Sequence, residues 1–254
     1  MARSAQMSAL DRIRAAASHA GILTDFDGTL APIVDEPDAA RPLEGIAELL
    51  AQLADRYALV AVLSGRPVTF LEQWLPSTVL LSGLYGLEVV RDGIRHDHPS
   101  GGMWREVVDD VATVARAAGL SGMRVESKGL SLTLHYRGHQ ELEGAVRELA
   151  EHQAARSGLS LRPARMSYEL HPPIDADKGT ALRDLANGLD ALCFLGDDRG
   201  DLPAFVELER LSSQGVTTAR IAVRSDEAPE ELLDAADLVV DGPEGVLELL
   251  RELL

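Results

Sequence analysis

Short apolar runs that end abruptly in polar residues constrain the fold of this chain more than any other feature. The runs cover residues 21–24, 57–63 and 191–195, and the polar clusters after them begin at Asp25, Ser64 and Asp197. A short, continuous apolar run is typical of a strand buried on both faces, as in a parallel sheet. Segments with helical periodicity, such as 42–56 and 178–187, separate these runs. The alternation predicts an α/β domain whose parallel sheet is covered by helices on both faces.

The carboxyl ends of the strands in an open α/β sheet line one crevice, where ligands bind. We therefore expect the three polar clusters to meet, although they lie far apart in the sequence. Further core helices are predicted at 8–19, 68–74, 202–209, 229–235 and 245–253, and further strands at 79–81, 220–223 and 238–240.

The pattern changes near residue 97, where Pro99 and Gly101-Gly102 break the alternation. Predicted helices at 104–118 and 141–155 and predicted strands at 123–127, 130–137, 159–162 and 167–170 follow. Strands that alternate in polarity predict an α+β insertion whose sheet has one open face. The chain is therefore expected to contain a discontinuous core of residues 1–97 and 174–254, interrupted by one inserted domain of residues 98–173.

The chain is strongly acidic, with 41 Asp and Glu against 24 Lys and Arg among its 254 residues and a formal charge of −17. This balance argues against a nucleic-acid partner, because phosphate backbones require a basic surface. The same acidity is unfavourable for binding a small anionic ligand, unless a metal ion and local geometry overcome the global charge.

Cysteine content and hydropathy bear on the compartment. The single cysteine, Cys193, cannot form an internal disulfide, which fits a reducing environment. No stretch approaches the roughly 18 uninterrupted apolar residues of a membrane span. Asp11, Arg12 and Arg14 interrupt the N-terminal segment, unlike a signal peptide. We expect a cytoplasmic monomer without membrane contact.

Asp25-Phe26-Asp27-Gly28-Thr29 is the strongest chemical motif in the chain. Alternation along a strand puts Asp25 and Asp27 on one side, and a turn after them can direct both at one site. One carboxylate can then attack phosphorus while the other donates and accepts a proton. Gly28 lets the backbone approach a ligand closely, and Thr29 can hydrogen-bond a phosphate oxygen. An ordinary turn at a strand end explains these five residues equally well when they are taken alone.

The other clusters also have a structural interpretation when each is taken alone. Ser64-Gly65 can be a simple turn, and Lys178 can be a solvated surface lysine. Asp197, Asp198 and Asp201 can cap a helix. However, three acids directly after a buried strand repel one another unless a cation lies between them. This repulsion favours a metal site with Asp197 as a direct ligand.

In their order along the chain, these motifs resemble the four motifs of the haloacid-dehalogenase-like phosphatases. The matching residues are Asp25-x-Asp27-x-Thr29, Ser64, Lys178 and the acidic cluster at 196–201. The resemblance implies a Rossmann-like core with a parallel sheet and an inserted α+β cap of the type called C2. It also implies that Asp25 is phosphorylated, that Asp27 transfers protons, and that Lys178 is a third catalytic residue.

The same resemblance implies a Mg²⁺ site. Its ligands would be Asp25, Asp197 and the backbone carbonyl of Asp27, and oxygen donors suit this hard ion. Asp198 and Asp201 would orient waters or the lysine without binding the ion directly. The phosphoryl oxygens would be bound by Thr29, Ser64, Gly65 and Lys178.

A closer resemblance is to the trehalose-6-phosphate phosphatases. It is carried by Leu63-Ser64-Gly65-Arg66, Gly196-Asp197-Asp198-Arg199, Val125-Glu126-Ser127-Lys128, Leu134-His135-Tyr136-Arg137 and Glu169-Leu170. This resemblance implies that Arg66, Glu126, Lys128 and Glu169 bind the substrate. Carboxylates accept hydrogen bonds from sugar hydroxyls and an ammonium group donates them. Cross-strand ion pairs on an exposed sheet face are the simpler explanation of the residues at 126 and 128 taken alone.

The chain departs from that family's pattern at Tyr85, where a histidine is usual, at Arg165, where a lysine is common, and at Gly200, which replaces a threonine. All three could adjust the choice of substrate. The sequence predicts a Mg²⁺-dependent phosphatase that converts trehalose 6-phosphate to trehalose and phosphate through an aspartyl-phosphate intermediate. The alternatives are a phosphatase of a related disaccharide or pseudo-sugar phosphate, a phosphomutase, and a non-catalytic sugar-phosphate sensor.

Overall fold

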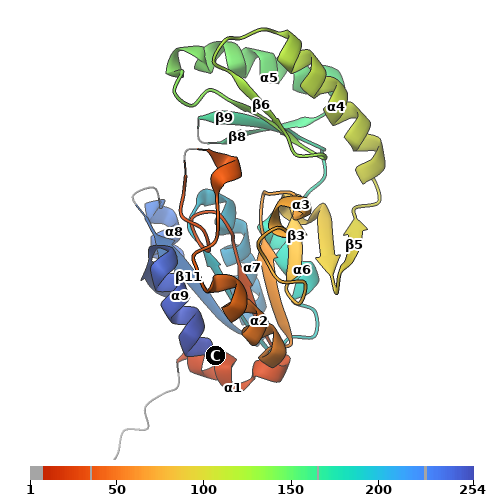
Figure 1. Ribbon diagram of the computed structural model, residues 1–254. Coiled ribbons are helices and arrows are strands. Elements are labelled where there is room, and N and C mark those ends of the chain that lie inside the picture. The colour runs from red at the N-terminus through yellow and green to blue at the C-terminus, as the bar shows by residue number, and fades with distance from the viewer. Residues whose placement is uncertain (1–7, 35, 165, 226–227) are drawn as a thin grey trace, which may run out of the picture. The chain divides into compact units, whose positions relative to one another are not determined.

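A computed structural model describes residues 8–34, 36–164, 166–225 and 228–254 (Figure 1). The chain divides into a core unit, Met1–His96 and Ala176–Leu254, and an inserted unit, Asp97–Asp175. Each unit has its own sheet and its own hydrophobic core, as an independent domain requires.

An eight-stranded sheet forms the centre of the core unit, with the strand order β12-β11-β10-β1-β2-β3-β4-β5. The strands are β1 (Ala20–Thr24), β2 (Leu59–Leu63), β3 (Leu80–Gly83), β4 (Glu88–Arg91), β5 (Ile94–Asp97), β10 (Ala191–Gly196), β11 (Thr217–Arg224) and β12 (Leu238–Asp241). The strands from β12 to β3 are parallel. Every residue of β1 and β10 is buried, as expected for strands that are covered on both faces.

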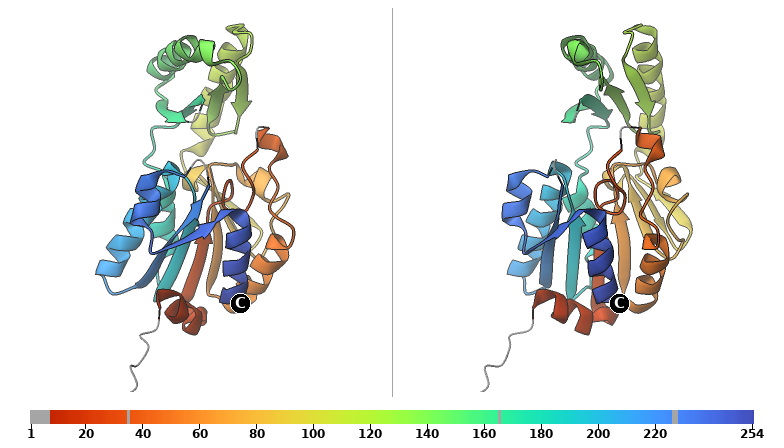
Figure 2. Two further views of the ribbon diagram at one scale, coloured as in Figure 1. Left: turned by 90° about the vertical axis from the view of Figure 1, so that its left-hand side faces the viewer. Right: turned by 60° about the vertical axis from the view of Figure 1, so that its left-hand side comes forward.

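Helices cover both faces of this sheet, as Figure 2 shows. One hydrophobic cluster joins the sheet to α1 (Ala9–Ala15), α2 (Ile46–Arg56), α3 (Val68–Leu71) and α9 (Gly242–Leu253), and a second joins it to α6 (Lys178–Leu185), α7 (Leu202–Ser213) and α8 (Glu230–Ala235). Alternate residues of β1 divide between them: Ile22 belongs to the first cluster and Leu23 to the second. The predicted α/β architecture with helices on both faces is confirmed.

The sequence prediction missed a hairpin at one edge of the sheet. β4 runs antiparallel to β3, and the Asp92-Gly93 turn leads from β4 into β5. Both turn residues have positive φ angles, 52° and 72°, which is typical of a two-residue hairpin turn. All four residues of β5 are exposed, so this strand lacks the apolar pattern that identified the others. The helices predicted at 8–19 and 68–74 are shorter, at Ala9–Ala15 and Val68–Leu71, and a 3-10 turn at Ala17–His19 follows the first.

The inserted unit is a four-stranded antiparallel sheet with two helices on one face. The strand order is β6-β7-β9-β8, and the elements are α4 (Gly101–Ala117), β6 (Arg124–Ser127), β7 (Leu132–His135), α5 (Glu143–Ser157), β8 (Ser160–Ala164) and β9 (Ser167–His171). Leu132, Leu134 and Leu170 pack with residues of α4 and α5. The opposite face carries a row of polar residues in register across all four strands: Glu126, Thr133, Glu169 and Arg162.

None of the helices in the described part of the chain combines the length and apolarity that a membrane-spanning segment requires. Cys193 is a free, fully buried thiol on β10, and burial raises its pKa to about 12. A thiol that stays protonated is neither a nucleophile nor a metal ligand. The chemistry of the core unit therefore has to come from its acids, hydroxyls and cations.

Candidate functional site

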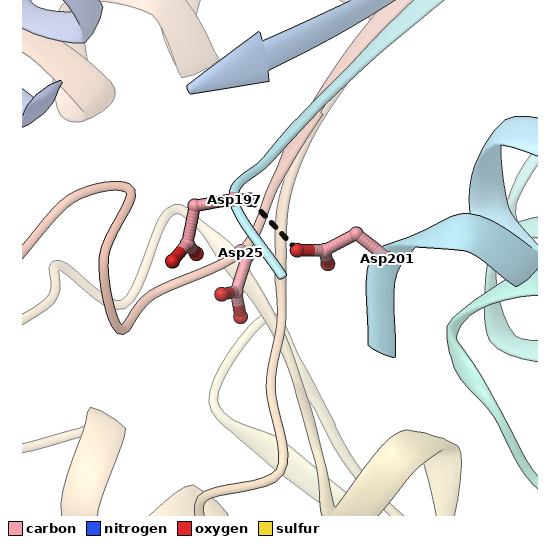
Figure 3. A group of neighbouring side chains, drawn as sticks. All are labelled: Asp25, Asp197 and Asp201. Atoms are coloured by element: carbon pink, nitrogen blue, oxygen red, sulfur yellow. Dashed lines mark hydrogen bonds between the residues drawn. The ribbon is translucent and has the colours of Figure 1, made fainter. Parts of the chain in front are cut away.

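Asp25 and Asp197 lie side by side because the strands that precede them are neighbours in the sheet. β1 and β10 pair in parallel with Thr24 opposite Leu195, and the Asp25 N–H donates to the Leu195 carbonyl at 2.8 Å. Both carboxylates are buried, with residue exposures of 4% and 3%, and Figure 3 shows them at the carboxyl end of the sheet. Two of the predicted clusters therefore meet, although about two thirds of the chain separates them.

Lys178 joins this pair from the first residue of α6. Its Nζ lies 2.7 Å from Asp25 Oδ1 and 2.6 Å from Asp201 Oδ1. Asp177 caps the helix by accepting from the Thr180 N–H, so the lysine is fixed at the start of a well-formed turn. Lys178 is 3% exposed, which rules out the interpretation as a solvated surface lysine.

Asp201 holds the lysine in place and also accepts two backbone hydrogen bonds. Besides the contact with Lys178, its Oδ2 accepts from the backbone N–H groups of Asp197 at 2.8 Å and Asp198 at 3.0 Å. The side chain is completely buried, and a Cβ atom at Gly196 would lie only 2.3 Å from its carboxyl carbon. Glycine at 196 is therefore required for the close approach, and Asp201 organises the turn and orients Lys178.

The buried charges of this cluster do not cancel. Carboxylate oxygens of Asp25, Asp197 and Asp201 lie within 4.8 Å of one another, against the one ammonium group of Lys178. Burial and the neighbouring carboxylates raise the pKa of Asp25 well above its ordinary value, although Lys178 acts in the opposite direction. Burial and Asp201 likewise raise the pKa of Asp197 to about 8.

Lys178, in contrast to the acids, is stabilised in its charged form by the cluster. Burial works against its charged form, but Asp201 and Asp25 outweigh burial and hold the pKa of Lys178 well above its ordinary value. When all three carboxylates are ionised, they exceed the single ammonium group by two negative charges, which a divalent cation would cancel. All candidate ligands are hard oxygen donors, so the donor set fits such a cation.

The loop after β1 brings two further predicted residues against Asp197. Thr29 is fully buried and its Oγ1 lies 3.3 Å from Asp197 Oδ1. Gly28 has a φ of 77°, and a Cβ atom there would lie 2.0 Å from Asp197 Oδ2. A side chain at position 28 is excluded by both the backbone conformation and the carboxylate. The chain thus uses Gly28 and Thr29 to fit the loop around Asp197.

Asp27 points to a different partner. Its carboxylate accepts from Arg66 Nε at 2.8 Å and Arg66 Nη2 at 2.7 Å, and its side chain is 40% exposed. Arg66 follows Ser64 and Gly65 in the loop after β2, which is the other strand beside β1. Sequence reasoning assigned Arg66 to the substrate and missed this ion pair.

Tyr85 contacts the same loop from the far side. Its N–H donates to the Ser64 carbonyl at 3.1 Å, and a Cβ atom at Gly65 would lie 2.7 Å from its hydroxyl oxygen. Leu84, Tyr85 and Gly86 have φ angles of 48°, 59° and 99°, a strained conformation for the first two. Backbone strain of this kind concentrates at functional sites. Tyr85, which stands where the family usually has histidine, therefore lies directly against the predicted phosphate-binding residues Ser64 and Gly65.

In the inserted unit, two of the three predicted sugar-binding residues lie together. Lys128 Nζ is 4.0 Å from Glu169 Oε1, to which Ser131 Oγ also donates at 2.9 Å. Glu126 lies across Thr133 from Glu169 in the sheet register and pairs with His135 Nε2 at 2.7 Å. Of the other two departures from the family pattern, Arg165 lies outside the described residues. Gly200 belongs to the core unit, where its N–H donates to Asp198 Oδ1 at 2.8 Å.

Glu207 links α7 to α6, the helix that begins at Lys178. It is 2% exposed on α7 and accepts from Arg183 Nη2 of α6 at 2.8 Å and from Arg210 Nε at 2.9 Å. Hydrogen bonds from Arg210, and then from Arg183, hold the pKa of Glu207 at about 2 although its burial acts in the opposite direction. The carboxylate therefore contributes to the stability of the α6–α7 pair.

We expect Glu207→Gln to lower the free energy of unfolding by about 2 kcal/mol at neutral pH, because two charge-assisted contacts are lost. A carboxylate whose pKa is lowered on folding stabilises the protein at pH values above its ordinary pKa, here 4.5. This stabilisation is lost as the pH falls from 4.5 towards 2. Urea unfolding at several pH values should show the gap between variant and wild type closing over this range. Glu209→Gln, on an exposed residue of the same helix, should change stability by less than about 0.5 kcal/mol. A gap that is the same at every pH would contradict the assignment.

Known proteins match this chain over most of its length. A sequence profile of the family described as Trehalose-phosphatase matches residues 23–236, which include the whole inserted unit. A trehalose-phosphate phosphatase of Mycobacterium ulcerans is 33% identical over 240 residues, covering 89% of this chain and 59% of that protein. One of Mycobacterium avium is 32% identical over 261 residues, covering 94% and 63%. The chain thus spans about three fifths of the length of these curated relatives.

Solved structures agree with the sequence matches. The C-terminal domain of Candida albicans trehalose-6-phosphate phosphatase has a TM-score of 0.76 and 25% identity, covering 96% of this chain and 94% of that one. A trehalose-6-phosphate phosphatase related protein also has a TM-score of 0.76, with 22% identity and coverage of 92% and 95%. At the lower identity the likeness shows the fold alone.

Proposed function

The chain belongs to the trehalose-phosphatase family, and on that premise we propose that it hydrolyses trehalose 6-phosphate to trehalose and inorganic phosphate. The observation that carries the proposal is the buried Asp25 carboxylate, held between Lys178 and Asp197 at the end of β1. A carboxylate fixed in this way is a nucleophile suited to phosphorus.

In the first step, a carboxylate oxygen of Asp25 attacks the phosphorus atom and the bond from phosphorus to the sugar oxygen breaks. The leaving oxygen takes a proton from the Asp27 carboxyl group, so the sugar departs as a neutral alcohol. In the second step, Asp27 takes a proton from water as the water oxygen attacks the phosphorus atom. The bond to Asp25 then breaks, which releases phosphate and restores the carboxylate.

Four residues of the core unit bind the phosphoryl oxygens in this proposal. The Lys178 ammonium supplies positive charge next to Asp25. Ser64 Oγ accepts from the Arg66 N–H at 3.1 Å, which leaves its O–H to donate to a phosphoryl oxygen. The backbone of Gly65 lies in the same turn. Thr29 contacts Asp197 and is assigned to the phosphate on the basis of the family resemblance.

We propose that Mg²⁺ is the divalent cation that neutralises the buried cluster. Asp25, Asp197 and the backbone carbonyl of Asp27 would hold it, and Asp198 and Asp201 would orient waters and Lys178 around it. When bound, the ion would offset the negative charge of the phosphoryl group. This cation resolves the conflict between a net charge of −17 and an anionic substrate.

The inserted unit would supply the sugar contacts. Glu126, Lys128 and Glu169 offer two acceptors and one donor for hydroxyl groups, and Lys128 and Glu169 already lie within 4.0 Å of each other. We assign substrate selection to this unit and to Tyr85. A monomeric state and a cytoplasmic location belong to the same proposal, the latter because the only cysteine is a free thiol.

The proposal is tested by measuring phosphate release from a panel of sugar phosphates with Mg²⁺ and with a chelator. We expect trehalose 6-phosphate to be hydrolysed fastest, release to fall to background with the chelator, and excess Mg²⁺ to restore it. Product analysis in the same reactions distinguishes the alternatives.

Faster release from another disaccharide phosphate would assign the chain to that substrate instead. Interconversion of sugar-phosphate isomers without net phosphate release would indicate a phosphomutase. Binding of trehalose 6-phosphate without turnover, in the presence of Mg²⁺, would indicate a sensor.

A further inference from the structure

Arg66 binds Asp27 through two of its three guanidinium nitrogens. Nε lies 2.8 Å from Oδ2 and Nη2 lies 2.7 Å from Oδ1, so the two planar groups meet as a fork on a fork. Such a bidentate pair fixes the plane of the carboxylate as well as its position. A monodentate contact would leave the carboxylate free to rotate.

An aromatic pair supports this arginine from behind. The guanidinium carbon of Arg66 lies 4.5 Å from the centre of the ring of Phe70, a residue of α3. The Phe70 ring in turn meets Phe26 edge to face, with ring centres 5.7 Å apart. Phe26 is fully buried and lies between Asp25 and Asp27 in the sequence. We call Arg66, Phe70 and Phe26 the Arg66 brace.

The backbone of Arg66 is fixed as firmly as its side chain. Its N–H donates to Ser64 Oγ at 3.1 Å, and its carbonyl accepts from the Leu84 N–H at 3.0 Å. A Cβ atom at Gly83 would lie 2.7 Å from that carbonyl oxygen, so neighbouring backbone closes tightly around it. The arginine is therefore held in place before any substrate arrives, and positioning Asp27 requires little further ordering.

We propose that Arg66 is a positioning residue that presents the Asp27 carboxyl group to the leaving oxygen, and that it does so without contacting the sugar. The proposal rests on the proposed function, because it concerns the proton transfer of that reaction. A carboxylate has about four lone-pair sites, and the guanidinium occupies one on each oxygen. The remaining lone pair of an oxygen is left to carry the proton that passes to the leaving oxygen and is later recovered from water. By fixing the plane of the carboxylate, the brace determines the direction in which that lone pair points.

Leaving-group dependence tests the brace. Trehalose 6-phosphate releases an alcohol and needs the proton from Asp27, whereas 4-nitrophenyl phosphate releases a phenolate that leaves without one. Arg66→Lys keeps the positive charge but loses the two parallel hydrogen bonds to the Asp27 carboxylate. We expect the rate of alcohol release in a rapid-quench single turnover with trehalose 6-phosphate to fall roughly 100-fold. With 4-nitrophenyl phosphate the first step should fall by less than about threefold, because proton donation contributes little to it.

Two further variants keep the test decisive. Phe70→Leu removes the supporting ring but not the arginine, and it should give the same pattern with a smaller loss of about tenfold. Arg41→Lys is the matched control, because Arg41 also stacks on an aromatic ring, 4.0 Å from the centre of Trp74, and lies outside the brace. Its rates on both esters should equal those of the wild type. If Arg66→Lys does not fold, as judged by its thermal transition, Phe70→Leu decides alone.

These measurements give different results if the Arg66 proposal is wrong and if the proposed function is wrong. A wild-type protein that hydrolyses neither ester overturns both. A wild type that hydrolyses both, with an equal loss on the two esters in Arg66→Lys, overturns the brace and leaves the phosphatase intact. A rise in KM for trehalose 6-phosphate with an unchanged first step would return Arg66 to substrate binding.

Discussion

Asp25→Asn is expected to abolish phosphate release without weakening the fold. An amide cannot form the aspartyl phosphate, so the rate should fall by roughly 10⁴-fold or more. The same change removes one of three buried carboxylates that share a single ammonium group. Burial raises the pKa of Asp25, so its ionised form opposes folding in the metal-free protein. We therefore expect the metal-free variant to unfold at a temperature equal to or above that of the wild type.

Two measurements check this expectation on the same sample: phosphate release with Mg²⁺, and thermal unfolding with a chelator present. Asp55→Asn is a suitable control because Asp55 is exposed in the last turn of α2. It should change neither quantity. An Asp25→Asn protein that turns over normally would remove Asp25 from the mechanism. A variant that unfolds much earlier would show that the buried charges are compensated in the metal-free state.

Lys178→Met should have the opposite effect on stability while also abolishing activity. Methionine has a similar length and no charge, so Asp25 and Asp201 would face each other without the cation that lies 2.7 and 2.6 Å from them. Removing one partner of a buried pair costs about 3–5 kcal/mol. Activity should be lost because the phosphoryl group and Asp25 lose their positive neighbour. Urea unfolding at neutral pH measures the first effect, and phosphate release measures the second.

The double variant Asp25→Asn/Lys178→Met separates charge from packing. If uncompensated charge is the cause, removing Asp25 as well should recover part of the lost stability and none of the activity. No recovery would mean that methionine disturbs the packing at the start of α6. A Lys178→Met protein as stable as the wild type would contradict the electrostatic account altogether.

The sequence was most informative where a buried strand is followed directly by reactive side chains. The apolar runs before Asp25, Ser64 and Asp197 predict strands because parallel strands are buried on both faces. Strands that share a sheet bring their carboxyl ends to one edge, and this physical rule placed Asp25 beside Asp197. Lys178 carried a further clue: the chain has only two lysines among its 24 basic residues, and the other is Lys128.

What the sequence did not reveal depends on side-chain geometry. Nothing in the order of residues shows that Arg66 turns towards Asp27 or that its guanidinium group lies over the Phe70 ring. Asp201 was expected to orient waters or the lysine, and its two hydrogen bonds to backbone amides, which follow from the turn at 197–201, were not predicted. The exposed β5 carries no hydrophobic pattern, so the hairpin at the sheet edge was missed.

The burial of Lys178 also determines its reactivity towards carbonyl compounds. An amine adds to the open-chain aldehyde of a reducing sugar only through its free lone pair, and the two flanking carboxylates keep Lys178 protonated by raising its pKa. We therefore expect glycation to spare the amine next to Asp25. Because arginine supplies nearly all of the other positive charges, few amines remain for reducing sugars to modify.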